Sequence, residues 1–131
     1  MKNVISTEKA PGAIGPYSQA IEIDNLVYTS GQLGIDPATG NFAEGVQGQT
    51  AQALENVKAI LETKGLTLDD IIKTTVFIKD MNDFGKINEV YAKYICGDIL
   101  PARSCVEVAR LPKDGLVEIE VIALKKYDSL C

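Results

Sequence analysis

Two stretches with helical periodicity, separated by a β-forming run, constrain the fold of this chain most. Over residues 46–64 and again over about 82–96, apolar residues recur at the spacing of one helix face. The two stripes are Ala53, Leu54, Val57, Ile60 and Leu61 in the first stretch, and Phe84, Ile87, Tyr91, Tyr94 and Ile95 in the second. Because each helix has a single apolar face to bury, both are expected to cover the same face of one sheet.

Extended runs account for most of the remaining chain. The run IIKTTVFIK at 71–79 is β-branched and aromatic, which strongly favours a strand. Further strands are expected at 3–6, 19–23, 26–30, 103–110 and 116–125. The order is therefore β-β-β-α-β-α-β-β, an α+β chain with a single mixed sheet. No spare element remains to cover the second sheet face, and oligomerisation is the simplest way to bury it.

Glycine, proline and capping residues mark the expected element ends. Gly65 follows the first helix and Gly97 is expected to end the second, as is typical of helix C-termini. Asp80 or Asn82 can cap the second helix at its N-terminus. Residues 36–40 (DPATG) form a turn, in which Pro presets one φ and Gly supplies a permissive one.

Composition limits both the architecture and the chemistry. The 131 residues correspond to one domain, 1–131, and the net charge of −5 argues against binding nucleic acid or an anionic membrane. The sequence holds no histidine, so no histidine general base, nucleophile pair or metal ligand exists. Its three cysteines, Cys96, Cys105 and Cys131, suit a reducing compartment, and no apolar run is long enough to span a membrane. A cytoplasmic, soluble protein is expected.

Charged residues recur on two strands that otherwise look buried. Strand alternation places Arg103, Cys105 and Glu107 on one side of their strand, and Glu118 with Glu120 on one side of another. A fixed arginine can hold a planar carboxylate in two hydrogen bonds, and a carboxyl in apolar surroundings has a raised pKa that suits proton transfer. The alternative is a structural cross-strand ion pair between Arg103 and a glutamate.

Other candidates carry alternatives of their own. Cys105 is a possible nucleophile, but a small buried apolar role is the commoner one. Tyr17 can line a pocket or anchor its loop. At Thr29-Ser30-Gly31-Gln32, the glycine permits close backbone approach, although a β-bulge explains it equally well. Asn88 can bind a backbone group or touch a ligand.

These residues lie in longer motifs that resemble a known family. The runs at 101–114 (PARSCVEVARLPKD) and 117–120 (VEIE), with 13–20 (AIGPYSQA), 29–32 (TSGQ) and 73–80 (KTTVFIKD), closely resemble the reactive-intermediate deaminase A (RidA) family. The resemblance covers essentially the whole chain. One departure is the segment 94–100 (YICGDIL), which looks shorter than its counterpart in the family.

The resemblance implies a fold, an assembly and an activity. The fold is chorismate-mutase-like, with a six-stranded mixed sheet and two helices on one face. Members form homotrimers with ligand clefts between subunits. They hydrolyse enamine and imine intermediates, such as 2-aminoacrylate and 2-aminocrotonate, to 2-keto acids and ammonia. No cofactor or metal is implied, and the partner is a small 2-imino or 2-keto acid with a free carboxylate.

The resemblance also implies residue roles. Arg103 would hold the substrate carboxylate, and Glu118 would polarise the attacking water. The main chain at Gly31 and Cys105 would hydrogen-bond the substrate. The rim of the cleft would be formed by Tyr17, Ser30 and Asn88.

Two other functions stay open at this stage. The same arginine cleft could belong to a ligand-sensing module that acts on a partner enzyme. RNA cleavage with translation inhibition, ascribed to some relatives, is less favoured because the chain is acidic and lacks histidine.

Overall fold

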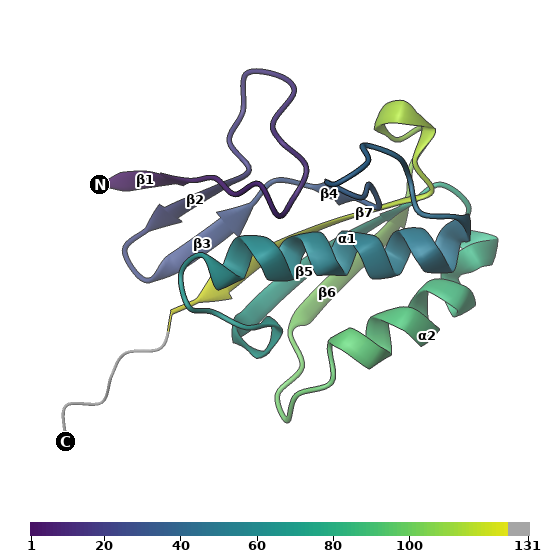
Figure 1. Ribbon diagram of the computed structural model, residues 1–131. Helices are drawn as coiled ribbons and strands as arrows, with labels where there is room; N and C mark the ends of the chain where they lie inside the picture. Colours follow the sequence, from purple (N-terminus) through teal and green to yellow (C-terminus); the bar gives the residue numbers. More distant parts are fainter. Residues whose placement is uncertain (126–131) are drawn as a thin grey trace.

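The computed structural model describes residues 1–125 and shows two α-helices against a mixed sheet (Figure 1). The helices are α1 (Gly45–Glu62) and α2 (Phe84–Tyr94), with short 3-10 turns η1 (Leu68–Asp70), η2 (Met81–Asp83) and η3 (Pro112–Asp114). The strands are β1 (Lys2–Ile5), β2 (Ala20–Ile23), β3 (Leu26–Thr29), β4 (Gln32–Leu33), β5 (Ile71–Ile78), β6 (Ala102–Glu107) and β7 (Val117–Leu124). Cys131, expected to be a free thiol, lies outside the described residues.

The sheet is mixed, as the sequence predicts, but it has seven strands rather than six. The main order is β1-β2-β3-β7-β5-β6, and β4 pairs with β7 beside this path. Only the β5–β6 pair is parallel among the described strands. Both helices lie on the same face of the sheet in Figure 1, which confirms the one-sided helix layer.

The additional strand arises from a bulge where the sequence had suggested one. The pairing Tyr28↔Ile122 of β3 with β7 gives way to Gln32↔Ile119 of β4 with β7, a shift of one residue in register. One extra residue on one side of an antiparallel pair is a β-bulge. Thr29 bridges the interruption, because its Oγ1 accepts a hydrogen bond from the Val121 N–H at 3.0 Å.

The core lies between α1 and the helix-facing side of the sheet. The predicted stripe on α1 is fully buried, and on β7 the burial alternates strictly along the strand. The residues at the centre of this contact, each with no exposed surface, are Ala53, Leu54, Val57, Ile60, Leu61, Val117 and Ile119. On α2, Ile87, Tyr91 and the adjoining Ile95 join the same cluster.

Two expectations about the helix ends need correction. Gly65 adopts φ +71° after α1, as predicted, but Gly97 has no positive φ and α2 already ends at Tyr94. A Cβ at position 97 would lie 2.8 Å from Oδ1 of Asp69, so this glycine allows a close loop contact instead. Asp80 accepts a hydrogen bond from the Asn82 N–H and thereby caps η2, not α2.

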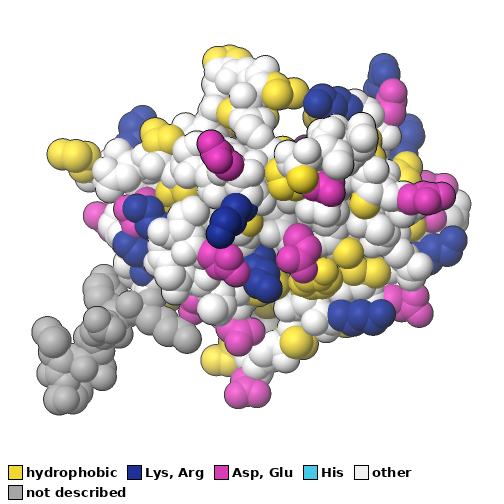
Figure 2. Space-filling model, in the orientation of Figure 1, with side chains coloured by type: hydrophobic (Ala, Val, Ile, Leu, Met, Phe, Trp, Pro, Cys, Tyr) yellow, Lys and Arg dark blue, Asp and Glu magenta, His cyan; other side chains and the backbone are white. Residues whose placement is uncertain are grey.

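The sheet face opposite the helices exposes several large apolar side chains and has no covering element within residues 1–125. Strand register puts Tyr28, Val106 and Leu124 on this face with Glu118 and Glu120. Their exposed fractions are 43% for Tyr28, 45% for Val106 and 39% for Leu124. The helix side, by contrast, carries charges of both signs (Figure 2).

None of the described helices is long and apolar enough to cross a membrane.

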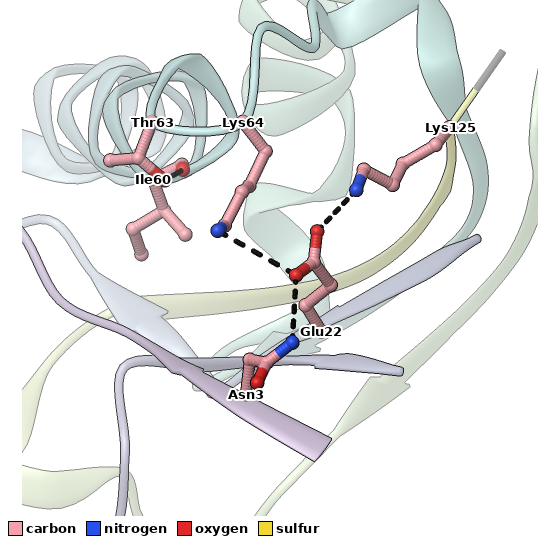
Figure 3. A network of polar contacts seen from close by, with 6 residues as sticks. All are labelled: Asn3, Glu22, Ile60, Thr63, Lys64 and Lys125. Atoms are coloured by element: carbon pink, nitrogen blue, oxygen red, sulfur yellow. Dashed lines mark hydrogen bonds and ion pairs between the residues drawn. The ribbon is translucent and has the colours of Figure 1, made fainter. Parts of the chain in front are cut away.

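A buried carboxylate joins the two ends of the described chain (Figure 3). Glu22 on β2 is only 7% exposed, and it hydrogen-bonds Lys125 beyond β7 and Asn3 on β1, the latter at 3.3 Å. Lys64 beyond α1 lies 3.6 Å from the same carboxylate. The hydrogen bonds from Lys125 and Asn3 lower the pKa of Glu22 below its ordinary value. The ion pairs therefore stabilise the folded state only while Glu22 is ionised.

We expect Glu22→Gln to lower the melting temperature at pH 7, because it removes the charge that both lysines face. A folded-state pKa below the unfolded one stabilises the protein above the unfolded value, and this stabilisation is lost as the pH falls through the folded value. The difference in melting temperature between wild type and variant should therefore narrow below about pH 4. Glu8→Gln, at an exposed position, is the control. A pH-independent difference would show that the charge is not the stabilising feature.

Candidate functional site

Arg103 lies on β6, on the sheet side that faces α2. Its Nη1 donates a hydrogen bond to Oδ1 of Asn88 at 2.7 Å. Its Cζ lies 4.8 Å from the ring centroid of Tyr91 and 5.6 Å from that of Phe84. Residues 84, 88 and 91 follow the i, i+4, i+7 spacing of one helix face. The Arg103 side chain thus lies against one face of α2 and does not extend freely into solvent.

The arginine has no carboxylate partner within residues 1–125, so the alternative of a structural cross-strand ion pair between Arg103 and a glutamate is wrong. Glu107, on the same side of β6, accepts a hydrogen bond from the Met81 N–H instead, at 2.8 Å. Glu118 lies on the other face of the sheet. A guanidinium has five N–H donors, and Asn88 is the one protein acceptor that Arg103 has among the described residues. Its remaining donors are available to a planar anion.

A cavity of about 340 Å³ opens beside Arg103. This volume lies in the lower part of the range of about 300–1,000 Å³ that is usual for ligand sites. The lining residues are Asn88, Tyr91, Ala92, Ile95, Leu100, Pro101 and Arg103. Asn88 and Arg103 therefore form the polar part of the cavity wall, and mainly apolar side chains form the rest. Leu100, in the segment 94–100, forms part of the wall.

Cys105 follows on the same side of β6, in register with buried Val76. It is partly buried and packs against the hydrophobic core. Burial raises the pKa of the thiol, and the opposing effect of Arg103 is the smaller one. A thiol with a raised pKa stays protonated near neutral pH, which favours a packing role over a nucleophilic one.

Glu118 is half-buried on the open face of β7. Burial raises the pKa of its carboxyl, and the neighbouring charge of Glu120 raises it further. A Cβ at position 31 would lie 2.6 Å from Cδ of Glu118, so the carboxylate lies directly against the backbone of Gly31. The bulge and its glycine create the space that Glu118 fills.

Ser30 directly precedes Gly31, and it connects this backbone to the loop that carries Tyr17. The Ser30 hydroxyl donates to the Ser18 carbonyl at 2.5 Å, which ties the loop that carries Tyr17 to the end of β3. Tyr17 is 50% exposed, and its hydroxyl accepts a 3.4 Å hydrogen bond from the Ile14 N–H. The phenol helps to anchor the loop, while the ring remains accessible to a ligand.

The candidate residues therefore form two groups on opposite faces of the sheet. We call Arg103, Asn88 and Cys105, with the cavity, the arginine half-site. We call Glu118 and the Gly31 backbone against it, with the adjoining Ser30 and the loop of Tyr17 that Ser30 holds, the glutamate half-site. One chain does not bring these two half-sites together. The described residues also hold no group of three or more Cys, Asp or Glu side chains that could bind a metal ion.

Sequence reasoning missed residues that hold the half-sites in place. Tyr91 and Phe84 were predicted as core, and their spacing with Asn88 is the signal that could have linked them to Arg103. Gln19, 4% exposed, binds the preceding loop through the Thr7 N–H at 2.7 Å and the Pro11 carbonyl, also at 2.7 Å. Nothing in the local sequence distinguishes Gln19 from an exposed glutamine.

Comparison with known proteins gives matches along almost the whole chain. The family model described as Endoribonuclease L-PSP matches residues 7–125. A RutC family protein of Pyrococcus horikoshii is 59% identical, with 96% of this chain and 100% of the relative covered. The 2-iminobutanoate/2-iminopropanoate deaminase of Salmonella typhimurium is 54% identical, with 96% and 100% covered.

Solved structures agree with the fold as well as with the sequence. The crystal structure of Escherichia coli TdcF with bound serine has a TM-score of 0.91 and 52% identity, covering 95% of this chain and 99% of that one. RidA from an Antarctic Psychrobacter has a TM-score of 0.90 and 48% identity, covering 93% and 98%. This chain belongs to the Endoribonuclease L-PSP family, together with the RutC family proteins and the 2-iminobutanoate/2-iminopropanoate deaminases.

Proposed function

We propose that this protein is a deaminase that hydrolyses 2-imino acids, and their enamine tautomers, to 2-keto acids and ammonia. The observation that carries the proposal is the arginine half-site, in which Arg103 has no carboxylate partner within residues 1–125 and lies beside a largely apolar cavity. Relatives at 51–54% identity carry the name 2-iminobutanoate/2-iminopropanoate deaminase. The TdcF structure holds serine, a small molecule with the same α-carboxylate.

The proposed active assembly is a homotrimer in which the half-sites of neighbouring subunits meet. Arg103 and Glu118 lie on opposite faces of one sheet, so a cleft that contains both needs two copies of the chain. The exposed apolar side chains of the open face supply a reason for association, because patches of this kind mark interaction surfaces. Packing this face against other copies would cover Tyr28, Val106 and Leu124.

In this cleft each group performs one task. Arg103 holds the substrate carboxylate, and the adjacent cavity receives the short aliphatic side chain. The main chain at Gly31 and Cys105 hydrogen-bonds the bound acid, and Tyr17, Ser30 and Asn88 form the rim. An enamine first takes a proton from solvent on its β-carbon and loses one from its nitrogen to become the imine. Because the imine is already electrophilic, orientation and one carboxylate are enough.

Glu118 carries out the proton transfers. Its ionised form removes a proton from water as the water oxygen bonds to C2. The resulting carboxyl then protonates the nitrogen, which gives a carbinolamine with a hydroxyl and an amino group on C2. A second transfer through Glu118 carries the hydroxyl proton to the amino group. The C2–N bond then breaks, ammonia leaves with the electron pair, and the C2 oxygen becomes the carbonyl of the keto acid. A pKa raised by burial suits a group that must accept and return a proton near neutral pH. None of these steps requires a cofactor.

Two competing functions make different predictions in the same experiments. A ligand-sensing module would bind 2-keto acids without turning over the imine. An RNA-cleaving protein, which the family description suggests, would bind RNA in a salt-dependent manner. The net charge of −5 and the lack of histidine favour the deaminase.

The proposal is tested by generating the imine with serine or threonine dehydratase and following its loss with and without the protein. Arg103→Lys keeps the charge but loses the planar fork, so kcat/KM should fall about tenfold to a hundredfold. Glu118→Gln keeps the shape but loses the basicity, so turnover should fall about a hundredfold. Affinity of Glu118→Gln for 2-oxobutanoate should change far less. Equal imine loss with and without the wild-type protein would refute the deaminase.

Gly31→Ala tests the position of the catalytic carboxylate without altering the carboxylate itself. The new Cβ would lie 2.6 Å from Cδ of Glu118 and must displace it. We expect turnover to fall about as far as in Glu118→Gln, roughly a hundredfold. Gly12→Ala is the matched control, because a Cβ there meets nothing within 4 Å. Normal turnover in a folded Gly31→Ala variant would mean that Glu118 does not act from this position.

A further inference from the structure

We propose that Tyr91 and Thr74 are positioning residues that fix the plane of the Arg103 guanidinium. Thr74 holds Tyr91 through its hydroxyl, and the Tyr91 ring holds the arginine. The proposal deepens the proposed function, because that function makes Arg103 the carboxylate anchor. Neither residue needs to touch the substrate's reacting atoms for this role.

The first step is the contact between Tyr91 and the arginine. The Tyr91 ring is the nearer of the two aromatic rings, at 4.8 Å from Cζ, and Phe84 stands at 5.6 Å. An aromatic face within about 6 Å attracts a guanidinium by cation–π interaction. Asn88, between them on the helix, fixes Nη1 by a hydrogen bond of 2.7 Å. Three residues of one helix stripe thus restrain the same side chain.

The second step is the bond that holds the ring. The Tyr91 hydroxyl and Oγ1 of Thr74 lie 2.8 Å apart, and Thr74 has no exposed surface. Its neighbours on the same side of β5, Val76 and Ile78, are apolar and buried. Valine would fill the same space as threonine, so packing alone does not account for a hydroxyl here. The hydroxyl has Tyr91 as its partner.

The third step is the register between strands. Thr74 on β5 stands opposite Arg103 on β6. The strand that neighbours the arginine therefore also holds the ring that contacts it, and α2 cannot shift over β6 without breaking this bond. Such restraint reduces the freedom that the arginine must lose when it binds a carboxylate. The guanidinium N–H groups of Arg103 that do not bind Asn88 then face the ligand in one fixed plane.

The fourth step compares a positioning role for Tyr91 and Thr74 with a role in packing alone. Loss of packing at Thr74, which does not line the cavity, would lower the melting temperature without changing how a folded variant binds carboxylates. Tyr91 lines the cavity, so for Tyr91 the rotation of the guanidinium is the readout that separates the two roles. A positioning role instead changes carboxylate affinity and KM, while kcat, which depends on Glu118, stays nearly constant. It also changes the rotation of the guanidinium about its Nε–Cζ bond.

The test compares Tyr91→Leu, Thr74→Val and Thr74→Ser with the wild type. We expect Tyr91→Leu to raise KM for 2-iminobutanoate and the dissociation constant of 2-oxobutanoate roughly threefold to thirtyfold. Thr74→Val should also raise KM and the dissociation constant, but by a smaller factor. Thr74→Ser keeps a hydroxyl and should restore wild-type values. Tyr94→Phe is the control, because the phenol of Tyr94 interacts with Glu55 rather than with the arginine.

A second readout separates this proposal from the proposed function. Nitrogen-15 NMR of the Arg103 side chain measures rotation about the Nε–Cζ bond in the protein without substrate. Rotation should be slow in the wild type and in Thr74→Ser, and faster in Tyr91→Leu. Unchanged rotation and unchanged 2-oxobutanoate affinity in folded Tyr91→Leu would overturn the positioning role. Lack of imine turnover by the wild type would refute the deaminase but leave the NMR result to decide this proposal.

Discussion

Alternation of side chains along β7 is the constraint on which the rest of this structure depends. Val117, Ile119 and Val121 point to one side and form the core with α1. Glu118 and Glu120 therefore have to lie on the other side, because successive residues of a strand face opposite ways. A shift of one residue in the pairing of β7 would expose the core and bury both carboxylates. The same packing that stabilises the fold thus fixes the face on which Glu118 stands.

The same rule explains why one chain carries half of each proposed cleft. Thr74, Val121 and Arg103 share the helix side of three neighbouring strands, whereas Glu118 belongs to the open face. On the helix side, aromatic rings and an amide restrain the arginine without neutralising it. On the open face, burial raises the pKa of Glu118, and its cross-strand partners, Leu33 and Phe77, are apolar. Association of copies through the open face is the arrangement that we propose to join the two chemistries.

Sequence reasoning predicted the parts of the fold that depend on local pattern. Periodicity located both helices and showed which residues share a side of β6 and which share a side of β7. That Arg103 and Glu118 lie on opposite faces of the sheet follows only from the register of both strands with β5. The extra strand β4 was missed because its pairing with β7 depends on a bulge and on contacts distant in sequence. Gly97 was misread because its role is a contact with Asp69 and not a left-handed turn. Tyr91 was assigned to the core, where it indeed packs, but its contact with Arg103 depends on how α2 lies over β6.

The central claim is that Arg103 of one subunit and Glu118 of a neighbour form one active site. The most direct test is to co-express Arg103→Ala and Glu118→Ala chains with different tags and to purify the mixed assemblies. If subunits associate at random, about a quarter of the clefts receive an intact arginine from one chain and an intact glutamate from the next. The account predicts imine hydrolysis at about that fraction of the wild-type rate, while each parent alone stays nearly inactive. Mixed assemblies as inactive as their parents would contradict it.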